Sequence, residues 1–375
     1  MREIPQIRFL TKPTLSPRVG PNLKEGLSTM SMLEKMIERE FENVHYRYDK
    51  KTGLRSIIAI HNTKRGPSLG GCRFYPYPNE EAGLKDVMNL AFAMTFKASL
   101  ADLALGGGKS IIFGNPKTEK TRDKLEVFGE FVASLNGRYI TSVDSGTTPE
   151  DLNVFKTKTD HVVGMTQDFG GSGDPSPTTA LGTFVGIQAC AEVVYGSTDL
   201  NGKTVTVQGV GNVGKVLVKY LLEAGSKVII ADYDQNKAQS FKAEYPDVEV
   251  VTHEEILFTK ADIFAPCAMG GVINPDTIET LQCTIVAGAA NNPLASMEIA
   301  NRLHEKGITY APDFAINAGG LIHVADELQG FDAKRVDDKT RKIFQTIQSI
   351  LTRSKKENIS PAKIARDMAK EAIPA

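Results

Sequence analysis

Two lysines twelve residues apart are the residues of this chain whose types and spacing point most directly to chemistry. Lys97 ends the run Met94–Lys97, and Lys109 directly follows three glycines, Gly106–Gly108. Lysine is rarely buried unless its charge is needed, and glycine allows positive φ and a close approach of the backbone to a ligand. We therefore predict that one lysine holds an anionic group while the other does chemistry beside it.

A carboxylate completes this constellation. Ser110–Phe113 and Arg138–Thr141 read as short strands, and the second ends just before Asp144. A carboxylate beside the two lysines could exchange protons with a group held there. A lysine that acts as a base near neutral pH must lose basicity through burial or through a neighbouring cation. Lys97 could supply that cation to Lys109, whereas without Asp144 and the glycines both lysines would read as solvated charges.

A second constellation has the spacing of a dinucleotide-binding turn. The strand-like run Thr204–Gln208 leads into a glycine-rich turn, a helical pattern over 215–223 and a second strand-like run, Lys227–Ala231, which ends at Asp232. The turn is formed by Gly209, Val210, Gly211, Asn212, Val213 and Gly214. Strand, glycine turn, helix, strand and acid in this order predict a Rossmann unit.

Each glycine of this turn has a physical task. Gly209 makes the tight turn, Gly211 lets a pyrophosphate approach the backbone, and Gly214 allows the helix to pack closely on the strand. The phosphates then lie at the helix N-terminus, where free N–H groups and the helix dipole favour anions. Asp232 would accept from the adenosine ribose hydroxyls and repel a 2′-phosphate, so the sequence favours NAD over NADP.

Length and composition limit the other possibilities. The 375 residues suffice for two domains, and a net charge of −1 gives no electrostatic footprint for nucleic acid. We expect no membrane span, because no apolar run approaches the required length, and no metal site. The widely spaced cysteines are read as free buried thiols of a cytoplasmic protein, and they are Cys72, Cys190, Cys267 and Cys283.

Alternating strand and helix patterns indicate an α/β fold with two domains separated by a cleft. We predict an N-terminal arm over 1–30, a substrate-binding and oligomerisation domain over 31–165, and an NAD-binding domain over 166–354. The last helix, over about 355–375 and opened by Ser360 as N-cap, is expected to return to the first domain. The arm lacks the apolar core of a signal peptide and reads as a flexible arm or oligomer contact, with a transit peptide as the alternative.

Nine motifs in order over 31–375 resemble the amino-acid dehydrogenase superfamily of glutamate, leucine, phenylalanine and valine dehydrogenases. The motifs span residues 66–73, 94–97, 106–109, 143–148, 209–214, 265–268, 289–292, 311–313 and 317–320. The resemblance implies reversible oxidative deamination of an L-amino acid to a 2-oxo acid and ammonia, with NAD taking the hydride. It also implies a homo-oligomer built through the N-terminal domain.

The resemblance also assigns roles to individual residues. Lys97 would bind the substrate α-carboxylate, Lys109 would activate the attacking water, and Asp144 would carry protons to and from the amino group. Asn291 and Asn317 resemble the asparagines that orient substrate and nicotinamide. Three further motif positions are assigned to the ligands, namely Gly70 and Gly71 to the substrate and Thr179 to the cofactor.

The side-chain pocket is only partly defined by the sequence. Relatives that act on glutamate have a lysine and a serine where this chain has Leu69 and Val324, and an apolar pocket cannot offset desolvation of a second carboxylate. Leu321 is the residue that phenylalanine-type enzymes have at this position. Ser142 is neither the glycine of aromatic-specific enzymes nor the alanine of leucine enzymes. His323 departs from the asparagine or glutamine of relatives and is read either as a packing residue or as a specificity residue. The sequence therefore predicts that the substrate is a hydrophobic L-amino acid of the phenylalanine or leucine type.

Two other functions remain open at this level. One is an enzyme that mainly aminates a bulky or indole 2-oxo acid, since direction depends on ammonia and cofactor levels. The other is a non-catalytic NAD-binding regulatory subunit, which would have no physical need for Lys97, Lys109 and Asp144 together.

Overall fold

The computed structural model describes residues 31–268 and 270–374, so the predicted arm over 1–30 lies outside the described residues. The chain divides into two units, Met1–Arg39 and Glu40–Ala375. In the described part of the first unit, α1 (Met32–Glu38) is opened by a capping box in which Ser31 and Glu34 bond each other's backbone amides. All other elements belong to the second unit.

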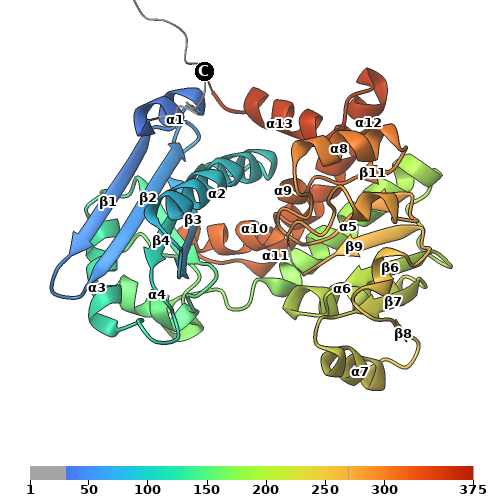
Figure 1. Ribbon diagram of the computed structural model, residues 1–375, viewed down its shortest axis with the longest axis horizontal. Helices are drawn as coiled ribbons and strands as arrows, with labels where there is room; N and C mark the ends of the chain where they lie inside the picture. Colours follow the sequence, from blue (N-terminus) through green and yellow to red (C-terminus); the bar gives the residue numbers. More distant parts are fainter. Residues whose placement is uncertain (1–30, 269, 375) are drawn as a thin grey trace, which may run out of the picture. The chain divides into compact units, whose positions relative to one another are not determined.

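Within the described residues, the first sheet has five strands in the order β1-β2-β4-β3-β5 (Figure 1). Its strands are β1 (Asn43–Asp49), β2 (Leu54–Asn62), β3 (Ser68–Tyr75), β4 (Gly106–Phe113) and β5 (Tyr139–Val143). β3 pairs in parallel with both β4 and β5, and β1 and β2 run antiparallel. The three parallel strands bring their carboxyl-terminal halves side by side.

Three helices accompany this sheet, and the longest is α2. They are α2 (Glu80–Leu100), α3 (Arg122–Ala133) and α4 (Pro149–Lys156). The apolar stripe of α2 is buried at Leu84, Val87, Met88 and Ala91, as core packing requires. α2 packs against β4 and β2, so that Lys97 in its last turn is positioned by the sheet.

The triple glycine does not have the positive φ or the approach to a ligand that the sequence suggested. Gly106–Gly108 are the first residues of β4, and none has a positive φ. A Cβ on Gly107 would lie 2.1 Å from the backbone nitrogen of Thr95 in α2, and a Cβ on Gly106 would lie 1.9 Å from the carbonyl oxygen of Asn62. The glycines therefore let α2 and β2 approach β4 closely. What lies against them is the rest of this protein and not a ligand.

The second sheet is wholly parallel, with six strands among the described residues in the order β11-β10-β9-β6-β7-β8. The strands are β6 (Thr204–Gln208), β7 (Lys227–Ala231), β8 (Glu249–Val250), β9 (Ile263–Pro266), β10 (Ile285–Val286) and β11 (Thr309–Tyr310). With β6 as first strand, this is the 3-2-1-4-5-6 order of a Rossmann domain. Strands and helices alternate along the chain, as the sequence predicted.

The helices of this part have the bounds α5 (Ser176–Tyr195), α6 (Asn212–Glu223), α7 (Gln235–Glu244), α8 (Met297–Glu305), α9 (Asp313–Ile316), α10 (Gly319–Ala325), α11 (Ala333–Arg341), α12 (Ile343–Glu357) and α13 (Pro361–Glu371). Short 3₁₀ turns span Gln167–Phe169, Glu255–Leu257, Thr277–Glu279 and Asp326–Gln329. The core of this part is built from the apolar faces of α5, α6 and α12 against β6, β7 and β9.

The last helix contacts α2 of the first sheet. Ser99 donates from its hydroxyl to the carbonyl oxygen of Ala369 in α13 at 2.8 Å. Ser360 precedes α13 as expected, but it does not cap the helix through its side chain. Its hydroxyl instead donates to Asn301 Oδ1 in α8 at 2.7 Å, because a second helix lies within reach. The predicted domain boundaries stay a prediction.

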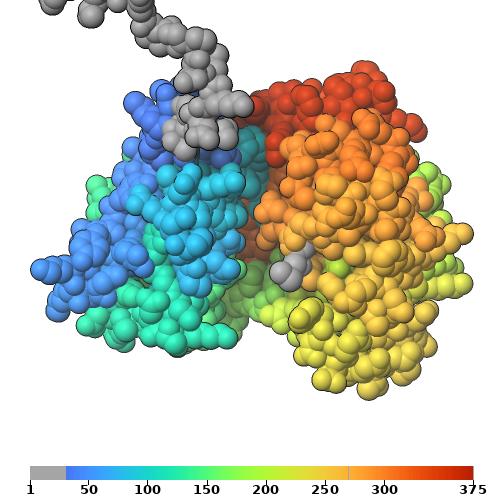
Figure 2. Space-filling view, in the orientation of Figure 1, coloured from blue at the N-terminus to red at the C-terminus, as the bar shows by residue number. Residues whose placement is uncertain are grey.

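No helix in 31–268 or 270–374 is long and apolar enough to cross a membrane. Figure 2 shows, within the second unit, a recess between the surface of the first sheet's part (blue to green) and that of the second (yellow to orange). The two parts are joined where α9 and α13 contact α2.

The close contact at β4 leads to a stability prediction. Gly107→Ala should lower the free energy of unfolding by about 1–3 kcal/mol, because the new methyl group overpacks against the backbone of α2. The midpoint of urea unfolding measures it. Gly53→Asn is the control, since Gly53 has φ +71° and open space, and asparagine tolerates that conformation. Equal midpoints for Gly107→Ala and the wild-type protein would contradict the prediction.

Candidate active site

Lys109 and Asp144 form a buried ion pair at the centre of the first sheet. Lys109 Nζ contacts Asp144 Oδ2, and the two side chains are only 8% and 13% exposed. Lys109 is held by β4, and Asp144 follows β5 directly. Gly71 on β3 lies beside them, and a Cβ there would come 2.9 Å from Asp144 Cβ. Glycine at position 71 therefore leaves the space that the Asp144 side chain occupies.

The backbone turn after β5 fixes Asp144 further. The Asp144 amide donates to Thr147 Oγ1 at 3.0 Å, and the Thr147 hydroxyl in turn donates to the carbonyl oxygen of Cys72 on β3 at 2.8 Å. Gly146 takes φ +85° to close the turn. The turn thus ties the carboxylate to the neighbouring strand.

Sequence reasoning missed a second cation on this carboxylate. Arg73 Nε donates to Asp144 Oδ1 at 3.0 Å, and Arg73 Nη1 donates to Asp86 Oδ2 at 2.8 Å. The guanidinium of Arg73 therefore bridges the two carboxylates. The signal was available, because residues two apart on a strand share a face and Arg73 stands two after Gly71. A strand prediction over 68–75 would have placed Arg73 on the same face as Gly71, although only the pairing of β3 with β5 brings it to Asp144.

Lys97 is directed at a different partner. Its Nζ donates to Asn291 Oδ1 at 3.3 Å, and Asn317 Nδ2 donates to the same oxygen at 2.8 Å. The structure thereby brings together three residues that lie far apart in sequence. Asn317 Oδ1 is buried and has no hydrogen bond within the described part of the chain, which leaves an acceptor available to a ligand donor.

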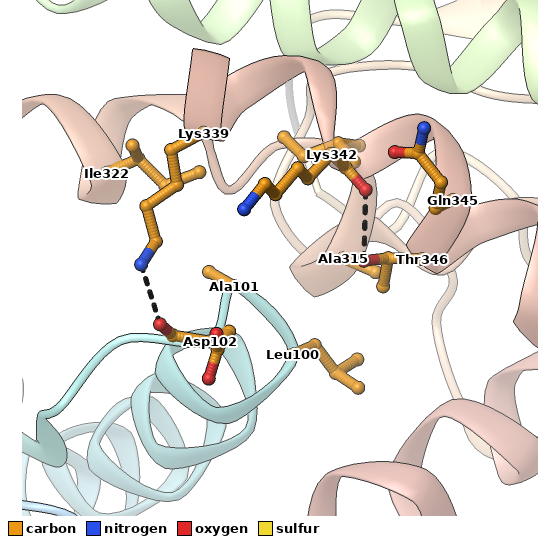
Figure 3. Close-up of a pocket in the computed structure, with 10 residues that line it drawn as sticks. Leu100, Ala101, Asp102, Ala315, Ile322, Lys339, Lys342, Gln345 and Thr346 are labelled. Atoms are coloured by element: carbon orange, nitrogen blue, oxygen red, sulfur yellow. Dashed lines mark hydrogen bonds between the residues drawn. The ribbon is translucent and has the colours of Figure 1, made fainter. Parts of the chain in front are cut away.

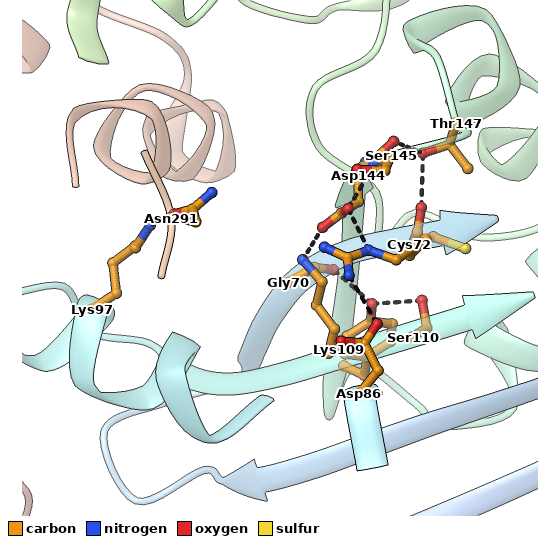
Figure 4. A network of polar contacts seen from close by, with 12 residues as sticks. Gly70, Cys72, Asp86, Lys97, Lys109, Ser110, Asp144, Ser145, Thr147 and Asn291 are labelled. Atoms are coloured by element: carbon orange, nitrogen blue, oxygen red, sulfur yellow. Dashed lines mark hydrogen bonds and ion pairs between the residues drawn. The ribbon is translucent and has the colours of Figure 1, made fainter. Parts of the chain in front are cut away.

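The charges around the two lysines differ from our expectation. Lys109 faces the anion Asp144, and Figure 4 shows Lys97 pointing away from it toward Asn291. The lysine whose pKa is lowered is Lys97. Burial lowers its pKa to about 8 against the opposing pull of Asp313, and Lys109 adds to the lowering. Asp144 is the charge that Lys109 contacts directly, while Lys97 and Lys109 lie within electrostatic range of each other.

Asp144 is held in its charged form. Burial disfavours that charge, but the cations of Lys109 and Arg73 outweigh burial and hold the pKa of Asp144 well below its usual range. An ionised carboxylate beside two buried cations is equipped to attract a ligand ammonium.

The predicted side-chain pocket residues are partly gathered into one apolar cluster. Leu69, Leu321 and Val324 pack in it together with residues that we had not singled out, and those are Met94, Ala98, Leu103, Leu105, Ile140, Val163 and Ala325. A Cβ on Gly164 would lie 2.9 Å from Ser142 Oγ and 3.8 Å from Val324 Cγ1. Ser142 therefore adds one hydroxyl to the edge of an otherwise apolar group.

The glycine turn after β6 has the shape that a dinucleotide needs. Gly209 has φ +100°, and a Cβ on Gly214 would come 2.0 Å from the Gly209 carbonyl oxygen. Around Gly211 the space is open, with Lys237 Nζ the nearest described atom, at 4.0 Å. Gly211 is the N-cap of α6 and provides no side-chain cap, so the first amides of the helix are available to phosphate. These residues fit a dinucleotide.

Asp232 lies at the end of β7 against this turn. Its Oδ2 accepts from the Val210 amide at 2.9 Å, and Lys237 Nζ lies 3.5 Å from the same oxygen. The carboxylate is thus tied to the turn backbone and borders the open space at Gly211. The remaining turn residues, Asn212 and Val213, are the first two of α6.

The Asn317–Gly320 motif brings α10 onto the first turn of α5. A Cβ on Gly319 would lie 2.2 Å from the Thr178 carbonyl oxygen, and a Cβ on Gly320 would lie 2.8 Å from Thr179 Oγ1. This close approach sets Thr179 near the start of α10 and leaves Asn317 at its entry. Gly70, in contrast, faces the Gly108 carbonyl in the first sheet.

His323 is buried with both ring nitrogens engaged. Nδ1 lies 2.9 Å from Thr178 Oγ1, and Nε2 lies 3.3 Å from the Ser172 carbonyl oxygen. Its ring packs on Phe331 with centroids 4.9 Å apart, and burial lowers its pKa. These contacts favour the packing interpretation over the specificity role.

A pocket of about 410 Å³ adjoins the end of α2, but it is not the site of the predicted chemistry. It lies between Leu100–Asp102 and the helices α9 to α12, where Lys339 Nζ donates to the Asp102 carbonyl oxygen at 2.7 Å (Figure 3). None of the predicted site residues lines it. The candidate site is instead the constellation of Lys97, Lys109 and Asp144 facing Asn291.

Comparison with known families decides the assignment. Residues 38–161 match the model described as Glu/Leu/Phe/Val dehydrogenase, dimerisation domain. Residues 170–236 and 230–373 match Glutamate/Leucine/Phenylalanine/Valine dehydrogenase. The chain belongs to this family. The resemblance inferred from nine motifs is confirmed, and the chain is an amino-acid dehydrogenase.

Individual relatives resemble the dehydrogenase over nearly its whole length. Leucine dehydrogenase of Bacillus subtilis (strain 168) is 43% identical over 345 residues, covering 92% of this chain and 94% of that protein. Phenylalanine dehydrogenase of Thermoactinomyces intermedius is 43% identical, covering 91% and 94%. The crystal structure of L-tryptophan dehydrogenase from Nostoc punctiforme aligns with a TM-score of 0.81 at 40% identity, covering 92% of this chain and 98% of that one.

The glycine turn of this dehydrogenase yields a binding prediction. Gly211→Ala should weaken NADH binding by at least about tenfold, or 1.4 kcal/mol, with an unchanged unfolding midpoint, because the methyl group enters open space meant for phosphate. Gly214→Ala should weaken binding and also lower the midpoint, since its methyl group meets the Gly209 carbonyl. NADH fluorescence titration and urea unfolding measure the two effects. Unaltered NADH affinity in Gly211→Ala would refute this placement of the phosphates.

Proposed function

We propose that this protein catalyses the reversible NAD-dependent oxidative deamination of a hydrophobic L-amino acid to its 2-oxo acid and ammonia. The observation that carries the proposal is the buried Lys109–Asp144 pair within electrostatic range of Lys97, which bonds Asn291, with a dinucleotide turn in the adjoining sheet. The names of the relatives, which act on leucine and phenylalanine, support the same reaction.

Each charged residue then has a task. Lys97 binds the α-carboxylate of the substrate, and Asn291, already within hydrogen-bond distance of Lys97, helps to orient it. Asp144 attracts the substrate ammonium and exchanges a proton with the amino group. Lys109 lies beside that carboxylate and activates the water that attacks the imine carbon. The apolar surroundings strengthen these interactions because they exclude water.

The cofactor in this proposal is NAD. When bound, it accepts a hydride from the substrate α-carbon. Gly211 and the first amides of α6 hold the pyrophosphate, Asp232 accepts from the adenosine ribose, and Asn317 with Thr179 contacts the nicotinamide end. A 2′-phosphate would meet the Asp232 carboxylate, so we propose a preference for NAD over NADP.

The substrate side chain is accommodated by the apolar cluster around Leu69, Leu321 and Val324. A glutamate γ-carboxylate would lose its hydration there, at a cost of several kcal/mol. Ser142 adds a polar edge, and the likeness to L-tryptophan dehydrogenase supports testing bulky aromatic substrates beside the aliphatic ones.

We also propose that the enzyme works in the cytoplasm as a homo-oligomer. Its cysteines are free thiols, as a reducing compartment would keep them. The family model over residues 38–161 is described as a dimerisation domain, which supports assembly through the first sheet's part. Light scattering of the purified protein tests this proposal.

A substrate panel tests the function. The purified protein should form NADH from leucine, phenylalanine, valine or tryptophan far faster than from glutamate, and should prefer NAD to NADP. Lys109→Ala should lower kcat by about 10²–10⁴ because it removes the acid–base group. Lys124→Ala is the matched control, since Lys124 is as buried but lies on α3. NAD binding without turnover on any amino acid would instead favour a regulatory subunit.

The pKa of Lys97 predicts how binding depends on pH. Because the folded-state pKa is lowered to about 8, the ammonium that binds the carboxylate is lost as pH rises through that value. The Kd of 4-methyl-2-oxopentanoate, titrated with NADH and no ammonia, should rise about tenfold per pH unit above 8. Lys97→Arg should abolish this dependence, since guanidinium stays charged. A wild-type Kd that stays flat to pH 9.5 would show that Lys97 is not the anchor.

A further inference from the structure

Arg73 connects two carboxylates that come from different elements. It lies near the end of β3, and its guanidinium reaches Asp144 after β5 at 3.0 Å and Asp86 on α2 at 2.8 Å. All three side chains are largely shielded, with exposures of 25%, 13% and 30%. A planar guanidinium can bond two partners in fixed directions, which an ammonium cannot do.

The two carboxylate oxygens of Asp144 have different partners. Oδ1 accepts from Arg73 Nε and from the Ser145 amide, whereas Oδ2 faces Lys109. Two donors therefore occupy Oδ1 and set the plane of the carboxylate. The oxygen that faces the reacting groups is Oδ2.

The far end of Arg73 is anchored as well. Asp86 accepts from the Arg73 guanidinium and from the hydroxyl of Tyr77. Asp86 stands eleven residues before Lys97 on α2, which is about three turns at 3.6 residues per turn, so both side chains lie on one face of the helix. Arg73 thereby links the turn that carries Asp144 to the helix that carries Lys97.

We propose that Arg73 is a positioning residue of the reaction. It keeps Asp144 an oriented carboxylate with Oδ2 toward Lys109, and through Asp86 it sets the helix that carries Lys97. The inference rests on the proposed function, because it concerns the task of Asp144 in that reaction.

Electrostatics around Asp144 supports the proposal. Burial alone would raise its pKa, and Lys109 and Arg73 reverse that effect. The titratable and charged groups that face Asp144 are Lys109, Arg73, Lys97, Cys72 and Tyr139. Loss of Arg73 would remove one of the two directly bonded cations, so the pKa of Asp144 would rise.

A merely structural tie between β3 and α2 makes a different prediction. Its removal would lower stability and leave the pH dependence of turnover in place. An effect on Asp144 moves the acid limb of kcat/KM, because activity needs the ionised carboxylate and is lost as pH falls through its pKa. The pH profile therefore separates the two roles.

The test compares kcat/KM against pH for the wild-type enzyme and two variants with its best amino acid. Arg73→Gln should shift the acid limb upward by at least one pH unit. Arg73→Lys should keep the limb near its wild-type position and lose about 10- to 100-fold in kcat/KM, because the charge remains but the orientation does not. Arg353→Gln is the matched control, since Arg353 also bridges two carboxylates, Glu357 and Glu371, on α12 and α13.

An unchanged acid limb in folded Arg73→Gln would overturn the proposal. If that variant does not fold, Asp86→Asn is the deciding test. It keeps the charge of Arg73 but removes the carboxylate that anchors the Nη1 end of the guanidinium. We expect at least a tenfold loss of kcat/KM with the acid limb in place, and wild-type kinetics would overturn the proposal. Absence of turnover in the wild-type protein would refute the proposed function itself, which is a separate result.

Discussion

A buried carboxylate between two cations organises the first half of this molecule. Asp144 would be unfavourable inside the protein as a lone charge, since desolvation costs several kcal/mol per ion. Lys109 and Arg73 offset that cost through their ion pairs with the carboxylate. The three groups come from three adjacent parallel strands, so the strand order β4-β3-β5 is what makes the cluster possible.

Glycines give these charges their close spacing. Gly71 gives Asp144 room beside β3, and Gly107 lets α2 lie directly on β4. The second sheet uses the same device, where Gly214 lets α6 start against the turn after β6 and Gly319 lets α10 pack on α5. In each case a single methyl group would separate two backbones that the site needs in contact.

Contacts between the two sheets' parts complete the site. Lys97 belongs to α2, while Asn291 and Asn317 come from the second part, and all three share one hydrogen-bonded cluster. A substrate carboxylate at Lys97 would therefore lie within reach of the asparagines that we propose to orient substrate and nicotinamide. The α13 helix, which bonds α2 through Ser99, holds the two parts together on another side.

The sequence alone determined the features that depend on local pattern. Strand, glycine turn, helix and acid over 204–232 predict the Rossmann unit, and that unit is present with β6, α6 and β7 at nearly the expected bounds. The fold class and the family were likewise predicted from motifs and are confirmed. Local pattern suffices there because neighbouring residues make the decisive contacts.

Only the tertiary structure decided what depends on distant pairs. The triple glycine proved to allow close packing, because the neighbour of Gly107 is Thr95 on the helix α2. The pKa of Lys97 is lowered because the folded chain buries its ammonium, and Asp144 is the charge that contacts Lys109. The role of Arg73 is apparent only from the pairing of β3 with β5, which brings its guanidinium to Asp144. Spacing along a chain does not determine which charges meet in space, and the register of the sheet does.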